Sequence, residues 1–181
     1  MTERVLYLMV TGAGPAKRVD VMIELAQDAG WSVYCIASPA AVTHFLDLAA
    51  IERLTGHPAR TGYRKPGDPS LPVPDAVIVA PATYNTINKF AAGIADTYLT
   101  TQLAELSGIG VPVVVLPFVN QSLASNRPFQ RSVEELRRDG VRVLLGEGAF
   151  EPHPPRGGDK VLDHYPWKLA LDSATEMAAP R

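Results

Sequence analysis

An α/β protein, built on a parallel sheet with helices on both faces, is the fold class that the sequence predicts. Three observations support it. Short apolar runs alternate along the chain with stretches whose apolar residues recur at helical spacing. Several of the runs are apolar without interruption, which is typical of strands buried on both faces. Gly and Pro residues punctuate the junctions between the two kinds of segment. Together these features indicate a Rossmann-like sheet in which strands and helices alternate.

The first half of the chain begins this alternation. Residues 4–10 form an apolar run that Thr-Gly-Ala-Gly-Pro ends, so we expect the first strand there. Apolar residues then recur at helical spacing up to Gly30, where the helix is expected to stop. Residues 31–38 give the second strand. Pro39 suits a helix N-terminus, so the next helix is expected over residues 39–48.

The second half continues the pattern. Residues 75–80 are expected to form a strand buried on both faces. The helix after it places Ile87, Phe90, Ala91 and Ile94 on one face. The remaining elements are expected as strands at residues 111–117 and 141–145 and as helices at residues 99–106, 128–139 and 165–177.

The length and composition indicate one domain. The two Pro/Gly-rich stretches, residues 62–74 and 146–159, are expected to be loops, and neither is long enough to separate two domains. We therefore expect a single domain over residues 1–181. The net charge of −2 gives no electrostatic reason for a nucleic-acid or membrane partner, and no metal site is expected.

Targeting and redox features point to a cytoplasmic protein. No secretory signal is visible, and no run of about 18 apolar residues suggests a membrane span. Cys35 is the only cysteine, so no internal disulfide can form. Its place in an apolar run predicts that it packs in the core.

Ligands of such sheets bind outside the carboxyl ends of the strands, where the direction of winding reverses. Gly12 and Gly14 follow the first strand, and glycines let a backbone approach a ligand closely. The third glycine of a dinucleotide fingerprint is replaced by Lys17, and the second strand ends in Ser38 rather than in an acidic residue, which disfavours NAD. Ser38 suits a phosphate; the alternative is a tight turn with a capping serine.

The third strand is followed by a cluster of small polar residues. Thr83, Asn85 and Thr86 lie at the predicted turn into the next helix. An N-cap explains one of the three but not all. Hydroxyls, an amide side chain and backbone amides on one turn suit the hydrogen-bonding edge of a flat heterocycle or its ribityl chain.

The segment APATYNTINKFAAGIADTYLT, residues 80–100, resembles the Pro-Ala-Ser-Ala-Asn-Thr segment of the homo-oligomeric flavin-containing cysteine decarboxylases. That family includes phosphopantothenoylcysteine decarboxylase and the lantibiotic peptidyl-cysteine decarboxylases. The start of the chain is also similar to the start of the family, and the resemblance covers residues 4–146. It implies a flavodoxin-like sheet, bound FMN, and a homotrimer or a dodecamer of trimers.

The resemblance also implies roles for individual residues. FMN phosphate is expected near Gly12, Gly14 and Ser38, and Phe45 is expected against the flavin. The Asp96 to Thr100 stretch is expected in an oligomer contact or at the rim of the flavin site. The contacts to the isoalloxazine and ribityl groups are expected from Pro81, Ala82, Thr83, Asn85 and Thr86.

The chain departs from the family at its catalytic base. The family uses a histidine before the third strand, where this chain has RKPGDPSLPVPDAVIVAPA and no histidine. Asp68 is the candidate base in this loop, provided that a dry site raises its pKa. His57 and His44 are further candidates, whereas His153 is expected on the surface or in a loop.

A second departure concerns the substrate. The family binds the substrate carboxylate with the Asn of Pro-x-Met-Asn-x-x-Met-Trp. Here PFVNQSLA keeps Asn120, which is expected to bind a carboxylate or an amide, while Val119 replaces Met and Leu123-Ala124 replaces Met-Trp. The loop at residues 146–159 is either a lid over the substrate or a passive connection.

Three hypotheses for function follow. The first is an FMN-dependent oxidoreductase or decarboxylase that acts on an altered small-molecule or peptide substrate. The second is a flavin-binding regulatory or partner subunit without catalysis, which the missing histidine and the changed Met-Trp favour. The third is a plain nucleotide-binding Rossmann domain that holds no flavin.

Overall fold

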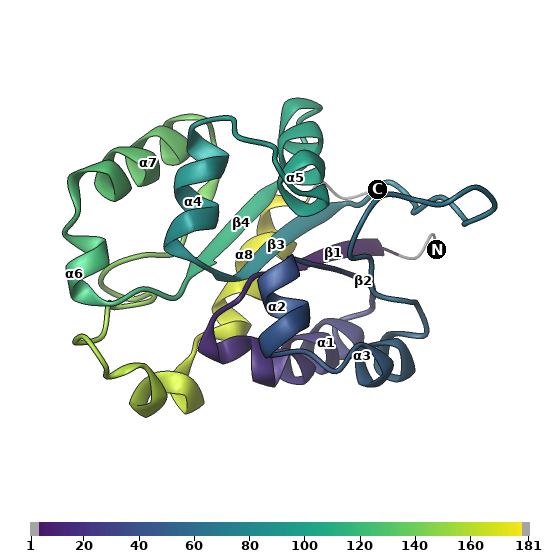
Figure 1. Cartoon of the computed structure of the whole chain (residues 1–181), viewed down its shortest axis with the longest axis horizontal. Coiled ribbons are helices and arrows are strands. Elements are labelled where there is room, and N and C mark those ends of the chain that lie inside the picture. Colours follow the sequence, from purple (N-terminus) through teal and green to yellow (C-terminus); the bar gives the residue numbers. More distant parts are fainter. Residues whose placement is uncertain (1–3, 179–181) are drawn as a thin grey trace.

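The sheet is parallel throughout, as predicted (Figure 1). The computed structural model describes residues 4–178. Its strand order is β2-β1-β3-β4-β5, which is the flavodoxin-like order, with a reversal of winding between β1 and β3. The strands are β1 (Arg4–Val10), β2 (Trp31–Ala37), β3 (Ala76–Ala82), β4 (Val113–Pro117) and β5 (Arg142–Val143).

Helices cover both faces of this sheet (Figure 1). One layer holds α4 (Tyr84–Ala91), α5 (Tyr98–Gly108) and α7 (Arg127–Arg138). The opposite layer holds α1 (Val19–Asp28), α3 (Leu48–Thr55) and α8 (Trp167–Met177). Short pieces follow the carboxyl ends of the strands: α2 (Pro39–His44), α6 (Gln121–Ala124) and the 3-10 helix η1 (Gly14–Arg18); a second 3-10 helix, η2 (Gly158–His164), precedes α8.

Burial explains why the apolar runs form central strands. Every residue of β3 and β4 is buried, as are the last five residues of β1. Leu6, Leu8 and Ile78 are fully enclosed between the two helical layers. Cys35 lies in the same core, as expected, and burial raises the pKa of its thiol to about 12. Among residues 4–178, no helix has the length and apolar character needed to span a membrane.

The expected helix at residues 39–48 is wrong in its extent. α2 ends at His44, and Asp47 begins a separate helix, α3, by accepting a hydrogen bond from Ala50 N at 3.1 Å. Asp is a strong N-cap because its side chain satisfies a free amide of the first turn. The chain therefore turns at Phe45, which lies between the two helices instead of on one of them.

The apolar face expected after β3 is also shorter than predicted. α4 ends at Ala91, and Gly93 adopts a left-handed backbone with φ of +68°. This turn carries Ile94 off the helix, and 47% of its surface is exposed. Ile87 is buried as expected.

Pro81 interrupts the hydrogen-bond ladder between β3 and β4. Val77 N donates to Pro112 O at 2.9 Å, and in a parallel pair the pattern advances by two residues, so residue 81 would donate to Leu116 O. Proline has no N–H to give. The Tyr165 hydroxyl, which precedes α8, instead donates to Leu116 O at 2.6 Å. Burial raises the pKa of this phenol well above its usual value, so it stays a donor.

We expect Tyr165→Phe to destabilise the fold by about 1–3 kcal/mol, because it leaves a buried carbonyl without a donor. Urea unfolding followed by circular dichroism measures the change. Tyr63→Phe is the control, since the Tyr63 hydroxyl bonds Thr101 at an exposed position and its loss should change stability by less than about 0.5 kcal/mol. Equal stabilities for the parent and Tyr165→Phe would contradict this account of the β4 tip.

Candidate functional site

A crevice of about 390 Å³ opens at the carboxyl ends of β1, β2 and β3. It lies where the winding reverses between β1 and β3, the position at which sheets of this order bind ligands. Its volume falls within the range of about 300–1,000 Å³ that is typical of small-molecule sites. The residues that line it are Thr11, Gly12, Ser38, Pro39, Ala40, Thr83, Asn85, Thr86, Lys89, Asp96, Thr97, Leu99 and Thr100.

Thr11 joins the tips of β1 and β3 beneath this crevice. Its side-chain Oγ1 donates to Pro81 O at 2.6 Å and accepts from Thr83 N at 3.0 Å. Its backbone N also donates to Pro81 O, at 3.2 Å. Thr11 is buried, so these bonds are shielded from water. They fix the floor of the crevice and hold the start of α4 beside the first strand.

Gly12 allows the β1 tip to approach the start of α2. A Cβ atom at position 12 would lie 2.8 Å from Ala40 Cβ and 3.3 Å from Ala41 N. No side chain fits in that space, so the glycine is required by close approach. Gly14 is less tightly confined, since its Cβ would meet the flexible side chain of Leu162 at 3.0 Å.

Three helices begin at the crevice, and each is capped by a hydroxyl. Ser38 Oγ accepts from Ala41 N at 3.3 Å at the start of α2, and Thr83 Oγ1 accepts from Thr86 N at 3.2 Å at the start of α4. Thr97 caps α5 with a reciprocal capping box to Thr100. The positive ends of three helix dipoles therefore point toward one crevice, which favours an anionic group.

The remaining polar groups of the crevice come from α4 and the turn after it. Asn85 is exposed, so its amide can both donate to and accept from a ligand. Lys89 forms an ion pair with Asp96, and its hydrogen bond is the main reason that the pKa of this carboxyl is lowered. The charges of this pair offset each other, so the helix N-termini dominate the local field.

Five of the residues expected at the cofactor line the crevice, namely Gly12, Ser38, Thr83, Asn85 and Thr86. Pro81 and Ala82 lie just beneath, buried in β3. Phe45 does not line it. Because the chain turns at Phe45, its ring lies in a separate groove beside α1 and α3. The centroid of this ring is 5.9 Å from Lys17 Nζ.

Asn120 lies at the tip of β4, outside the crevice. Its Oδ1 accepts from Leu123 N at 2.9 Å and so caps α6, while the amide nitrogen stays available to a ligand. The 146–159 loop folds back beside it, since Gln121 N donates to His153 O at 2.8 Å.

His153 lies in a loop, one of the two places expected for it, but it is buried and not on the surface. Its exposed fraction is 8%, and its ring lies 5.0 Å from that of Phe118. Nδ1 is 2.9 Å from Pro154 O and therefore carries the proton that bonds it. In the part of the chain that the structure describes, Nε2 is enclosed without a hydrogen-bond partner.

Asp68 does not meet the requirements of a general base. It lies outside the crevice, where it accepts hydrogen bonds from Lys65 N at 2.9 Å and from Arg60 at 3.3 Å. The bond from the Lys65 amide is the main reason that the pKa of this carboxyl is lowered, whereas the expected role needs a raised pKa. These contacts disfavour the predicted role of Asp68.

The other histidine candidates also lie apart from the crevice. His57 stacks on Tyr34 with ring centroids 4.0 Å apart, and His44 ends α2 on an exposed turn. Across residues 4–178, no group of three or more His, Cys, Asp or Glu side chains is placed to hold a metal ion. The segment that begins at Thr11 was expected at the ligand-binding edge of the sheet, but the role of the Thr11 side chain in joining β1 and β3 was not predicted.

Comparison with known proteins identifies the family. Residues 1–158 match the family model named Flavoprotein. The Coenzyme A biosynthesis bifunctional protein CoaBC of Bacillus subtilis (strain 168) is 29% identical over 147 residues, which span 77% of this chain but only 35% of that protein.

Solved structures agree in fold. The FMN-dependent cysteine decarboxylase SpaF superposes with a TM-score of 0.71 at 24% identity, over 97% of each chain. The FMN-binding protein AtHal3 gives a TM-score of 0.67 at 19% identity, over 84% of this chain and 89% of that one. At these identities the likeness shows that the fold is shared.

We expect Gly12→Ala to destabilise the protein by about 1–3 kcal/mol, because the new methyl group would overlap Ala40 and push α2 away from β1. Thermal or urea unfolding measures the loss. Gly62→Ala serves as the matched control, since a Cβ there meets nothing within 4 Å. If both variants are as stable as the parent, the close approach at the crevice floor is not a constraint.

Proposed function

This chain belongs to the Flavoprotein family, and on that premise we propose that it binds FMN in the crevice at the β1/β3 junction. The observation that carries the proposal is the convergence of three capped helix N-termini on a cavity of about 390 Å³. Backbone amides and hydroxyls there suit a phosphate, and the exposed amide of Asn85 suits the edge of a heterocycle.

The residues present fit the cofactor. Gly12 lets the start of α2, with the Ser38 cap, lie against the tip of β1, since a Cβ at position 12 would overlap Ala40. Ser38 Oγ accepts from Ala41 N and still has its own proton to donate to a phosphate oxygen. Asn85 and Thr86, in the first turn of α4, are proposed to hold the heterocycle and the ribityl chain.

We further propose that the protein is an oxidoreductase or decarboxylase whose substrate differs from that of the cysteine decarboxylases it resembles. Bound FMN would supply an acceptor for two electrons. Asn120 would orient a substrate carboxylate or amide with its free amide nitrogen. The loop at residues 146–159, which contacts Asn120 through its bridge to His153, would cover that group.

A second candidate function is a flavin-binding regulatory or partner subunit without catalysis. Two observations favour it. The resemblance places the family's base in the segment before β3, where this chain has no histidine, and hydrogen bonding by the Lys65 amide lowers the pKa of Asp68 in that segment. The trimeric or dodecameric assembly and the cytoplasmic location stay predictions.

Flavin binding is tested by the absorbance of the purified protein and by titration of FMN into protein freed of cofactor. We expect bands typical of a bound flavin and quenching of FMN fluorescence at one FMN per chain. A colourless protein that leaves FMN fluorescence unchanged would favour the plain nucleotide-binding domain and end the proposal.

Asn85→Asp should raise the Kd for FMN about tenfold or more. The carboxylate would face acceptor atoms of the heterocycle where an amide donor stood, at a cost of about 1–3 kcal/mol. Asn126→Asp is the control for the added charge, because Asn126 lies before α7 and outside the crevice. If the variant binds FMN as tightly as the parent, Asn85 does not contact the cofactor.

Anaerobic reaction with a cysteine-ended peptide separates the two candidate functions. A decarboxylase of this type should lose the visible absorbance of its oxidised flavin to the extent of its FMN content, with release of carbon dioxide. A regulatory subunit should keep its spectrum. Unchanged absorbance with peptides and with other thiols would reject the catalytic proposal and leave flavin binding standing.

A further inference from the structure

The crevice proposed for FMN contains one pair of opposite charges. Of the described residues that line it, Lys89 and Asp96 alone are charged, and the Lys89 ammonium donates a hydrogen bond to the Asp96 carboxylate. The other lining side chains are hydroxylic, amide or apolar. Every full charge in the wall of the crevice therefore belongs to this pair.

The chain is folded so that the pair can form. Lys89 lies in the last turn of α4, and a continuous helix would place residue 96 about 10 Å further along the axis. Instead, Gly93 turns the chain with a φ of +68°, and Ile94 N donates to Lys89 O at 2.8 Å. This turn returns Asp96 to the ammonium of Lys89, directly before Thr97, which caps α5.

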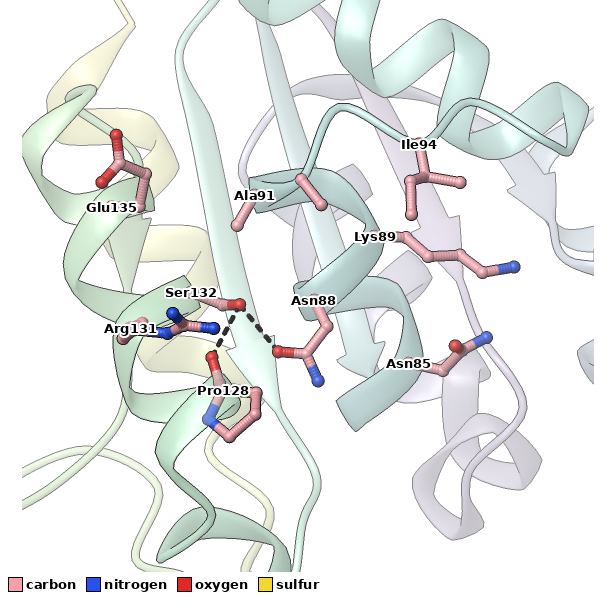
Figure 2. A pocket seen from close by; sticks show the side chains of 10 residues that line it. Asn85, Asn88, Lys89, Ala91, Ile94, Pro128, Arg131, Ser132 and Glu135 are labelled. Atoms are coloured by element: carbon pink, nitrogen blue, oxygen red, sulfur yellow. Dashed lines mark hydrogen bonds between the residues drawn. The ribbon is translucent and has the colours of Figure 1, made fainter.

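Lys89 lies on the same side of α4 as Asn85, the residue proposed to hold the heterocycle. Residues four positions apart are neighbours on the surface of a helix. Figure 2 shows both side chains directed away from α7, whereas Asn88 points toward that helix, with its Oδ1 2.7 Å from Ser132 Oγ. A ring held by the Asn85 amide would therefore lie beside the Lys89 ammonium.

Folding stability gives little reason for this pair. The Lys89 side chain is 26% exposed and the Asp96 side chain is 48% exposed. Ion pairs with this much access to water contribute little to the free energy of unfolding. A ligand that fills the crevice displaces water and strengthens the interactions of nearby charges. The effect of the pair is therefore largest on a bound ligand.

A charge next to a flavin ring affects its two oxidation states unequally. Reduction adds two electrons and one proton to the oxidised ring, so the reduced ring carries one negative charge. An unpaired ammonium beside the ring stabilises this anion, and an unpaired carboxylate destabilises it. An ammonium and a carboxylate that are paired with each other have a much smaller net effect.

We propose that Asp96 sets the reduction potential of the bound flavin by withholding the charge of Lys89 from it. Without Asp96, Lys89 would favour reduced FMN over oxidised FMN. Without Lys89, Asp96 would favour oxidised FMN. Asp96 is thus a positioning residue that acts through Lys89. This inference rests on the proposed binding of FMN, whereas the ion pair itself does not.

The ion pair is tested on the cofactor-free protein. The hydrogen bond from Lys89 is the main reason that the pKa of Asp96 is lowered. Lys89→Met should therefore raise this pKa toward the ordinary range of an aspartate, as measured by carboxyl ¹³C NMR during a pH titration. A pKa that is the same in the parent and the variant would show that the pair does not form in solution and would overturn the proposal.

The effect on the flavin is measured as the midpoint potential of the FMN-loaded protein, equilibrated with a reference dye at mildly alkaline pH. Asp96→Asn should raise the ratio of reduced to oxidised FMN affinity about tenfold, which is an upward shift of about 30 mV for a two-electron couple. Lys89→Met should lower the ratio by a similar factor. The double variant, which has neither charge, should lie within about twofold of the parent.

Lys168 and Asp172 provide the matched control. They form the same kind of ion pair on α8, with 2.6 Å between Lys168 Nζ and Asp172 Oδ2, in the helical layer across the sheet from α4 (Figure 1). Lys168→Met and Asp172→Asn should each change the ratio less than about twofold. Asp96→Glu, which keeps the carboxylate, should stay closer to the parent potential than Asp96→Asn.

Opposite shifts in the two single variants, cancelled in the double variant, would support the proposal. Shifts of the same sign, or a parental potential in Asp96→Asn, would overturn it. An Asp96 that only stabilises the N-terminus of α5 would change the affinity for both oxidation states alike. The fluorescence titration of the parent keeps this test separate from the proposed function. If the parent does not bind FMN, both proposals are rejected, and if it binds FMN without these shifts, this inference alone is rejected.

Discussion

The junction that Thr11 makes between the tips of β1 and β3 is the interaction on which the rest of the site depends. Pro81 cannot donate a hydrogen bond, so this part of β3 leaves the regular ladder. On the side that faces β1, Thr11 donates twice to Pro81 O and accepts from Thr83 N. Without that tie, nothing in the backbone ladder would hold the start of α4 beside the first strand. At the tip of β4, the Tyr165 hydroxyl donates to Leu116 O, which Pro81 cannot do.

The placement of the helices follows from that junction. Because the winding reverses between β1 and β3, the loops after these strands separate to opposite sides and leave a crevice. Three helices then begin at its rim, each with a hydroxyl cap. Their dipoles give the crevice a positive potential although the chain as a whole carries a net charge of −2. Such a potential favours an anionic group.

Much of the fold could be predicted from the sequence, because buried parallel strands are continuous apolar runs and all five were expected near their observed places. The caps at Ser38 and Thr83 could also be predicted, because Ser and Thr directly before a helix are strong N-caps, while their contact with a cofactor stays a prediction. The sequence was a poor guide to the place of Phe45 and to the pKa of Asp68, because contacts made only in the folded chain decide both. Asp47 starts a new helix and moves Phe45 away from the crevice, and hydrogen bonds in a folded loop, which no sequence pattern shows, hold Asp68 in its ionised form.

Amide hydrogen exchange, measured with and without FMN, tests the central claim most directly, because it reports both binding and its place. The account predicts that FMN slows exchange in the turns after β1, β2 and β3 and in the first turn of α5, at one FMN per chain. FMN binding that leaves these turns unchanged and protects another part of the chain would contradict it.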